Sequence, residues 1–148
     1  MFGFLKNTQQ VDEEVQDEFI ERVNGAAQAF LDAVPDTSAM DYSVESIAAL
    51  DAVLEAAHRG LLTLTPMQTV GAAAYLYEVA RRRYGGLYEV CDDADPVVLV
   101  TGEPEFDVCL CAISKVERRV RDGATDTLPE FFQQYVRAVN ARASDTIR

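Results

Sequence analysis

Apolar residues recur every three or four positions along the first half of the chain, a spacing that predicts amphipathic helices. In residues 11–34 these positions are Val15, Phe19, Val23, Ala26, Phe30 and Val34, with acids on the opposite face. A second helix is predicted from Val44 to His58, with Asp41 or Ser43 as its N-cap. Pro35 ends the first helix and Gly60 ends the second.

The strongest local pattern lies between Thr65 and Gly86, in the stretch TPMQTVGAAAYLYEVARRRYGG. Thr65 and Gln68 match a capping box, and Pro66 occupies the first helical position, where proline is favoured. Residues 70–77 are apolar or small around the whole circumference, which indicates a helix buried on all sides. We therefore expect this helix to lie at the centre of the core.

The periodicity changes after the double glycine. Short apolar runs at 87–91, 97–101 and 106–112, joined by turn-like segments, predict a three-stranded antiparallel meander. Two helices follow, one from about Ile113 to the residue before Gly123 and one opened by Thr127. The predicted fold is a single α+β domain spanning residues 1–148, with three N-terminal helices, the meander and two C-terminal helices. Residues 1–10 and 143–148 are expected to be frayed.

Charge narrows the choice of partners. The 148 residues contain 25 acids and 13 bases, for a formal net charge of -12. Such a field repels phosphate backbones and anionic lipid surfaces, so neither nucleic acid nor a membrane is an expected partner. A basic protein partner fits, although an acidic surface also serves solubility alone. No apolar run is long enough for a signal peptide or a membrane span, so we expect a cytoplasmic protein.

Cysteine and histidine are too sparse to predict a metal or cofactor site. Cys91, Cys109 and Cys111 are an odd set, and His58 is the only histidine. A Cys3His site is arithmetically possible but lacks the usual CxxC spacing, so we expect buried cysteines and no metal or other cofactor. His58 lies at the end of its helix, where a positive charge favours the helix dipole. Asp92, Asp93 and Asp95 are expected to form a turn rather than a calcium loop.

The acid within the central helix is the main candidate for chemistry. At 100° per residue, Glu78 shares one narrow face with Gly71 and Ala74, which allow another backbone to approach closely. A carboxylate in such a seam must be paired, hydrogen-bonded or protonated. One interpretation is an internal ion pair with Arg81 or Arg82, at i+3 and i+4. The functional alternative is an acid in a pocket beside Tyr75 and His58.

Two arginine clusters have a similar pair of interpretations. The first cluster is the triplet at 81–83, in the last turn of the central helix. The second lies on one face of the helix predicted from about Ile113 and consists of Lys115, Arg118, Arg119 and Arg121. Both are expected to be solvated faces, because an anion site requires the two clusters to converge. No serine-hydrolase elbow, dinucleotide fingerprint or phosphate loop is present in the sequence.

Two segments match known motifs. The segment Asp41-Tyr42-Ser43-Val44-Glu45-Ser46-Ile47, followed by Leu50-Asp51, is similar to the pattern "DYS-x-ES-h-x-x-LD", where h is apolar. Residues 71–79, with Arg81 to Gly86 and Tyr88, resemble the helix pattern "GAYLGEVLRR-x-GG-x-W". Together they resemble the opening and the following helix of a family of small bacterial domains without an assigned activity. Tyr77 replaces a usual glycine and Tyr88 a usual tryptophan. The resemblance covers roughly residues 40–90 and implies an α+β domain, but it supplies no site.

Three functions stay open on sequence alone. The first is a non-enzymatic binding module with an acidic surface, such as an adaptor or immunity-like protein, that takes a basic partner. The second is a small-ligand binder or enzyme with a pocket near Glu78, Tyr75 and His58. The third is a structural subunit of a homodimer, where the alternative is a monomer. Missing catalytic motifs favour the first.

Overall fold

The computed structural model describes residues 2–91 and 94–148, with side chains from residue 13 onward. Five helices and a four-stranded sheet form in this part of the chain, which confirms an α+β fold. The helices are α1 (Phe2–Ala33), α2 (Ile47–His58), α3 (Pro66–Tyr84), α4 (Ala112–Asp122) and α5 (Leu128–Ala141). The strands are β1 (Leu87–Val90), β2 (Val97–Thr101), β3 (Val108–Leu110) and β4 (Asp145–Ile147). None of these helices is both long and apolar enough to cross a membrane.

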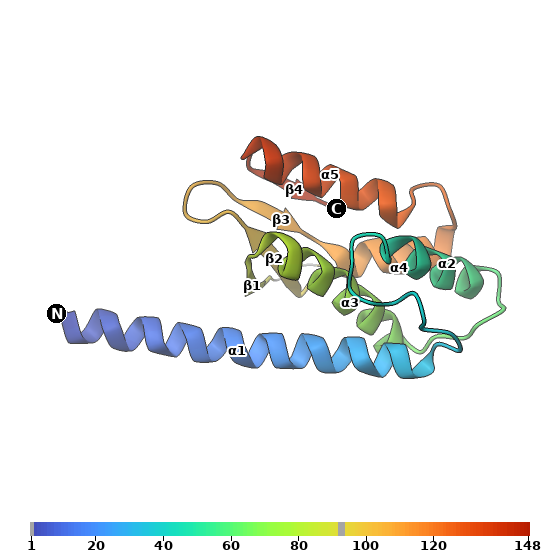
Figure 1. Ribbon diagram of the computed structural model, residues 1–148, viewed down its shortest axis with the longest axis horizontal. Helices are drawn as coiled ribbons and strands as arrows, with labels where there is room; N and C mark the ends of the chain where they lie inside the picture. Colours follow the sequence, from blue (N-terminus) through green and yellow to red (C-terminus); the bar gives the residue numbers. More distant parts are fainter. Residues whose placement is uncertain (1, 92–93) are drawn as a thin grey trace.

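Helix α3 runs through the middle of the molecule, with α1 and α5 on opposite sides of it (Figure 1). Every residue from Gly71 to Ala80 is buried, as the apolar pattern predicts. The seam with α1 is tight at Gly71, where a Cβ atom would lie 2.5 Å from the Ala26 carbonyl oxygen. The small residue at position 71 therefore determines how closely the two helices pack.

The predicted capping box at the start of α3 is confirmed. The Thr65 side chain accepts a hydrogen bond from the Gln68 backbone N–H at 3.1 Å. The Gln68 side chain accepts one in return from the Thr65 backbone N–H at 2.9 Å. Two backbone donors at the helix N-terminus are thus satisfied within a single turn.

The predicted three-stranded meander is incomplete. Strands β1, β2 and β3 are antiparallel neighbours, but β4 adds to β3 in parallel, giving a mixed sheet in the order β1-β2-β3-β4. The expectation of a frayed tail at 143–148 was therefore wrong, and the described chain ends in a strand instead of a helix. Ile147 is buried in the main core, which explains why this short strand is held in place.

Several predicted boundaries also shift. Helix α1 begins at Phe2 instead of Val11, so residues 2–10 belong to a helix. Helix α2 begins at Ile47, and its N-cap is Ser46 instead of Asp41 or Ser43. The third strand is shorter than 106–112 because the chain turns into α4 at Ala112. Hydrogen bonds within the turn that precedes α2, such as the one from the Ser46 backbone N–H to Ser43 Oγ, explain its later start.

Side chains satisfy backbone groups at both edges of the sheet. At the β1 edge, Gln16 Nε2 donates to the Tyr88 carbonyl oxygen at 2.7 Å. Gln16 Oε1 accepts from the Tyr88 backbone N–H at 3.0 Å, so one amide copies the bonding of a neighbouring strand. At the β4 edge, the Thr146 backbone N–H donates to Asp145 Oδ1 at 2.8 Å.

Candidate functional site

Glu78, the acid of the central helix, is fully buried between α3, α1 and β1. Its two carboxylate oxygens accept a forked pair of hydrogen bonds from Arg81, with Nε at 2.7 Å and Nη2 at 2.9 Å. Arg82 Nε donates to Oε1 at 3.2 Å. Glu78 therefore forms the internal ion pairs that its spacing to both arginines predicts.

Partners from outside α3 complete the network around Glu78. The Tyr88 hydroxyl of β1 donates to Glu78 Oε2 at 2.7 Å, and Asn24 Nδ2 of α1 donates to Oε1 at 3.0 Å. Asn24 Oδ1 also accepts from Arg82 Nη2 at 2.6 Å. A single carboxylate thus joins α3 to the long N-terminal helix and to the first strand.

The network keeps Glu78 ionised. Burial alone would raise the pKa of its carboxyl, but hydrogen bonds from Arg81, Tyr88 and Arg82 outweigh it and lower that pKa to about 2. Burial and the bond to Glu78 raise the pKa of the Tyr88 phenol above its usual value. A general acid or base near neutrality needs a pKa close to the working pH. These values instead suit a fixed structural charge.

Tyr75 lies in a different set of contacts. Its hydroxyl accepts from the Tyr42 backbone N–H at 2.9 Å and lies 2.6 Å from Ser46 Oγ. Its ring stacks on Tyr42 with centroids 4.4 Å apart, and the Arg82 guanidinium covers the Tyr42 ring at 3.8 Å. Tyr42 has a φ of 63°, an unusual value for an aromatic residue. Tyr75 thus holds the turn before α2 in a conformation that this turn would otherwise disfavour.

His58 is exposed and contacts neither Glu78 nor Tyr75. Its Nδ1 lies 2.8 Å from the Val120 carbonyl oxygen of α4. On the other side of the ring, a Cβ atom at Gly123 would lie 2.8 Å from Nε2. The three residues of the predicted pocket therefore do not converge on one site. Arg82 links the partners of Glu78 and Tyr75, because it binds Glu78 and covers the Tyr42 ring, whereas His58 binds α4. None of the three lines either of the cavities described below.

A second buried charge network joins α2 to α4. Arg119 is 2% exposed, and its Nε and Nη2 donate to the two Asp51 oxygens at 2.9 and 3.1 Å. Its Nη1 donates to Glu55 Oε1 at 2.9 Å. Hydrogen bonds to Asp51 and Glu55 raise the pKa of Arg119. The expectation of a solvated face was wrong for Arg119 and for the equally buried Lys115, whose ammonium binds Asp126.

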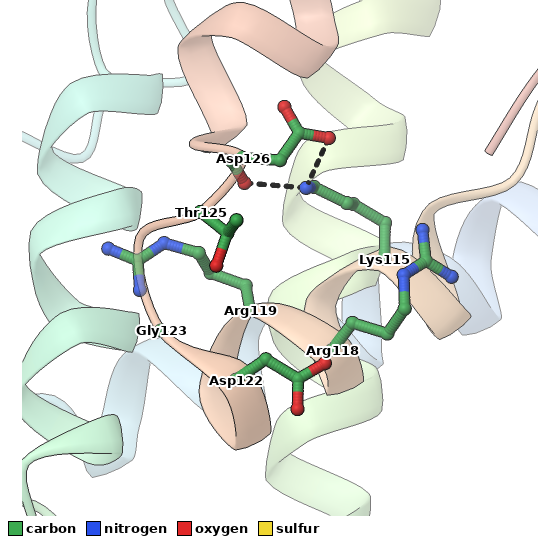
Figure 2. Close-up of a pocket in the computed structure, with 7 residues that line it drawn as sticks. All are labelled: Lys115, Arg118, Arg119, Asp122, Gly123, Thr125 and Asp126. Carbon is green, nitrogen blue, oxygen red and sulfur yellow. Dashed lines mark hydrogen bonds and ion pairs between the residues drawn. The ribbon is translucent and has the colours of Figure 1, made fainter.

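Lys115, Arg119 and Asp126 border a polar hollow of about 200 Å³ next to the α4–α5 connection (Figure 2). Its lining residues are Lys115, Arg118, Arg119, Asp122, Gly123, Thr125 and Asp126. Lys115 and Arg119 are already paired with carboxylates, Lys115 at 2.8 Å from Asp126 Oδ2. The two arginine clusters do not converge on one site, because Arg81 and Arg82 bind Glu78 while Arg119 binds Asp51 and Glu55.

The cysteines gather on the face of the sheet that lies away from the main core. Cys111, Val98 and Val100 form a small buried cluster, with Cys91 and Cys109 packed against it. Cys109 Sγ and Cys111 Sγ are 3.9 Å apart, and burial raises the pKa of Cys111 to about 12. Protonated thiols are poor nucleophiles and poor metal ligands. Among the described residues, no group of three His, Cys, Asp or Glu is placed to hold a metal ion.

Of the predicted acidic turn, Asp92 and Asp93 lie outside the described residues. Asp95 is buried and binds the first turn of α4. Its Oδ1 accepts from the Ser114 backbone N–H at 2.8 Å, and its Oδ2 accepts from Ser114 Oγ at 2.6 Å. A carboxylate in the loop before β2 thus caps the helix that follows β3.

An apolar groove of about 200 Å³ lies along the seam of α1 and α3, next to the start of β2. It is lined by Phe19, Arg22, Val23 and Ala26 from α1, Val70, Ala74 and Tyr77 from α3, and Val97 and Ile113. Between residues 13 and 22 of α1, five acids are exposed: Glu13, Glu14, Asp17, Glu18 and Glu21. No ion pair between described residues engages these acids.

Comparison of the sequence with protein-family models and with curated proteins, and of the fold with solved structures, gave no match.

Proposed function

We propose that this protein is a non-enzymatic interaction module whose acidic surface binds a basic protein partner. The observation that carries the proposal is the acidic outer surface of α1, which presents Glu13, Glu14, Asp17, Glu18 and Glu21 to solvent. Acids spaced along one exposed helix create a local field that attracts a positively charged partner and raises its association rate.

The arrangement of the buried charges supports binding rather than catalysis. Glu78 is fixed by two arginines, an amide and a phenol, and its pKa of about 2 leaves no proton to transfer near neutrality. Tyr75 and His58 bind the chain elsewhere. Membership in the family of small bacterial domains that the sequence resembles, and a cytoplasmic location, belong to the same proposal.

The test is affinity capture from cells of the source organism with three baits, the wild type and two charge-matched variants. In one variant Glu14, Glu18 and Glu21 become lysine, and in the control Glu45, Glu103 and Glu130 become lysine. All six are exposed, and both variants change the net charge equally. We expect the wild type and the control to retain a basic protein that the α1 variant loses.

The captured protein is then purified and titrated calorimetrically against the same three baits. We expect the α1 variant to bind at least about tenfold more weakly, with an affinity that falls steeply with salt. A partner bound equally by all three baits, or the absence of any basic partner, would overturn the proposal. Light scattering on the same samples reports whether the protein pairs with a second copy instead.

A further inference from the structure

We propose that the α1–α3 groove is the docking site for a basic amphipathic helix of the partner. This inference rests on the proposed function and adds to it the place where the partner binds and the kind of segment that it presents. The groove supplies the apolar contact, and the acids that flank it supply the charge complementarity.

The size of the groove favours a side chain of a macromolecule over a free small molecule. Its volume of about 200 Å³ lies below the roughly 300–1,000 Å³ of typical small-molecule pockets. Interfaces between proteins commonly place one large apolar or aromatic anchor in a pocket of this kind. The floor is suited to such an anchor, because Val23, Ala74 and Val97 present apolar atoms.

Exposed apolar side chains extend the groove into a stripe. Among the described residues, three of the six exposed large apolar side chains lie here, namely Val15 at 42% exposure, Met67 at 79% and Val70 at 39%. Val15 is one turn before Phe19 on α1, and Met67 is one turn before Val70 on α3. The stripe along α1 from Val15 to Ala26 is about 16 Å long at 1.5 Å per residue. That length matches about three turns of a bound helix with anchors at i, i+3 or i+4, and i+7.

Acids flank this stripe on both sides. At 100° per residue, Glu18 and Glu14 lie on the outward side of α1 next to Arg22. On α4, the exposed Glu117 lies one turn after Ile113, which lines the groove. Arg22 is the one basic side chain among the lining residues. A helix with an apolar face bordered by lysines or arginines is therefore complementary in both shape and charge.

The test uses a synthetic peptide of about 18 residues of leucine and lysine, with the leucines at helical spacing. Two control peptides have the same leucines with glutamate in place of lysine, or the same composition with the leucines scattered around the helix. Binding is measured by fluorescence anisotropy, and amide NMR shifts report the contact surface. Circular dichroism checks that each protein variant is folded.

Two protein variants separate the groove from the charge. Val15→Gln with Val70→Gln removes the apolar rim, and its matched control, Leu61→Gln with Leu87→Gln, removes exposed apolar residues elsewhere. We expect the rim variant to bind the leucine–lysine peptide at least about tenfold more weakly, and the control to stay within about twofold. NMR shifts should concentrate on Val23 and Ala74, and both control peptides should bind weakly.

The outcomes distinguish this inference from the proposed function. One outcome is that the α1 charge variant loses the peptide but the rim variant keeps it. Another is that the peptide with scattered leucines binds equally well. Either result overturns docking in the groove and leaves the acidic interaction surface in place. If the wild type does not bind the helical peptide at low salt, the groove is overturned, and partner capture decides the proposed function separately. Equal binding by the rim variant and its control also overturns the groove.

Discussion

Each of the two buried charge networks pairs a buried charge with groups of opposite sign, but the partners come from different places in the chain. Around Glu78, one anion is held mainly by two arginines of its own helix, three and four residues away. Around Arg119, one cation is held by Asp51 and Glu55 of a different helix. In the first network, helical spacing alone brings Glu78 to its arginines, and Asn24 of α1 and Tyr88 of β1 then bind the same carboxylate. The second exists only after α2 and α4 have packed, so it reports the tertiary fold.

The two networks also differ in the groups that would be left without a partner. Both central charges are buried, with 0% of the Glu78 side chain and 2% of the Arg119 side chain exposed. Every group that binds Glu78 is a hydrogen-bond donor, and one of them is the buried Tyr88 hydroxyl, which water does not reach. Asp51 and Glu55, which bind Arg119, are 16% and 26% exposed, so water can solvate them if Arg119 is removed. Replacing the central charge should consequently cost more in the Glu78 network.

The largest effect is expected for Glu78→Gln, which keeps the shape and removes the charge. The pKa of about 2, compared with the ordinary 4.5, corresponds to about 3 kcal/mol of stability from the ionised form. Urea unfolding at pH 7 should show a loss of this order. The exposed control Glu21→Gln, in the interior of α1, should lose less than about 0.5 kcal/mol. A loss below about 1 kcal/mol in Glu78→Gln would contradict the contrast between the networks.

The same substitution should change how stability depends on pH. Because the pKa of Glu78 is lower in the folded protein, the ionised carboxylate stabilises the fold fully above pH 4.5. This contribution is lost as the pH falls toward 2. The stability gap between wild type and Glu78→Gln should therefore narrow steadily between pH 5 and the lowest accessible pH. A gap that stays constant over this range would show that Glu78 does not titrate as described.

Arg119→Met should destabilise by about 2 kcal/mol, because it leaves two partly hydrated acids between α2 and α4. Arg119→Lys should lose about half as much, since lysine keeps the charge but not the forked geometry. Arg118→Met is the matched control at a half-buried neighbouring position. Urea unfolding tests all three variants. If Arg119→Met costs more than Glu78→Gln, the buried donors around Glu78 do not determine which network contributes more stability.

The smallest effect is expected at a contact that lies within one turn. Thr65→Ala removes one bond of the capping box and should cost about 1 kcal/mol. Thr63→Ala, at an exposed position outside the helix, is the control and should be neutral within about 0.5 kcal/mol. An unchanged thermal midpoint for Thr65→Ala would show that neighbouring donors compensate for the cap.

The distance along the chain between two contacting residues explains which contacts the sequence could predict. Thr65 with Gln68, and Glu78 with its arginines, are separated by at most four residues, so helical geometry alone brings them together. Asp51 and Arg119 are 68 positions apart, and no local pattern joins them. The spacing of Asp51 and Glu55 on one helix was the available signal, because two acids at i and i+4 beside an apolar stripe suggest a cation on the partner helix.

The missed strand has a comparable cause. Three residues are too few to show an alternating pattern, and β4 pairs in parallel with a strand that lies far back in the sequence. Its position depends on α5 returning the chain to β3, where Ile147 enters the core. The separation of Tyr75, Glu78 and His58 likewise required the packing of α2 against α4 and of α3 against α1.

The Gln16 amide and the Asp145 carboxylate have a consequence for self-association. A sheet with two free edges can add copies of itself without limit and so form fibres. Here Gln16 occupies both outward backbone groups of Tyr88, and Asp145 occupies the outward N–H of Thr146. A second copy would have to displace these side chains before its own strand could pair. These two side chains therefore hinder the addition of a strand at Tyr88 and at Thr146, one position on each edge of the short sheet.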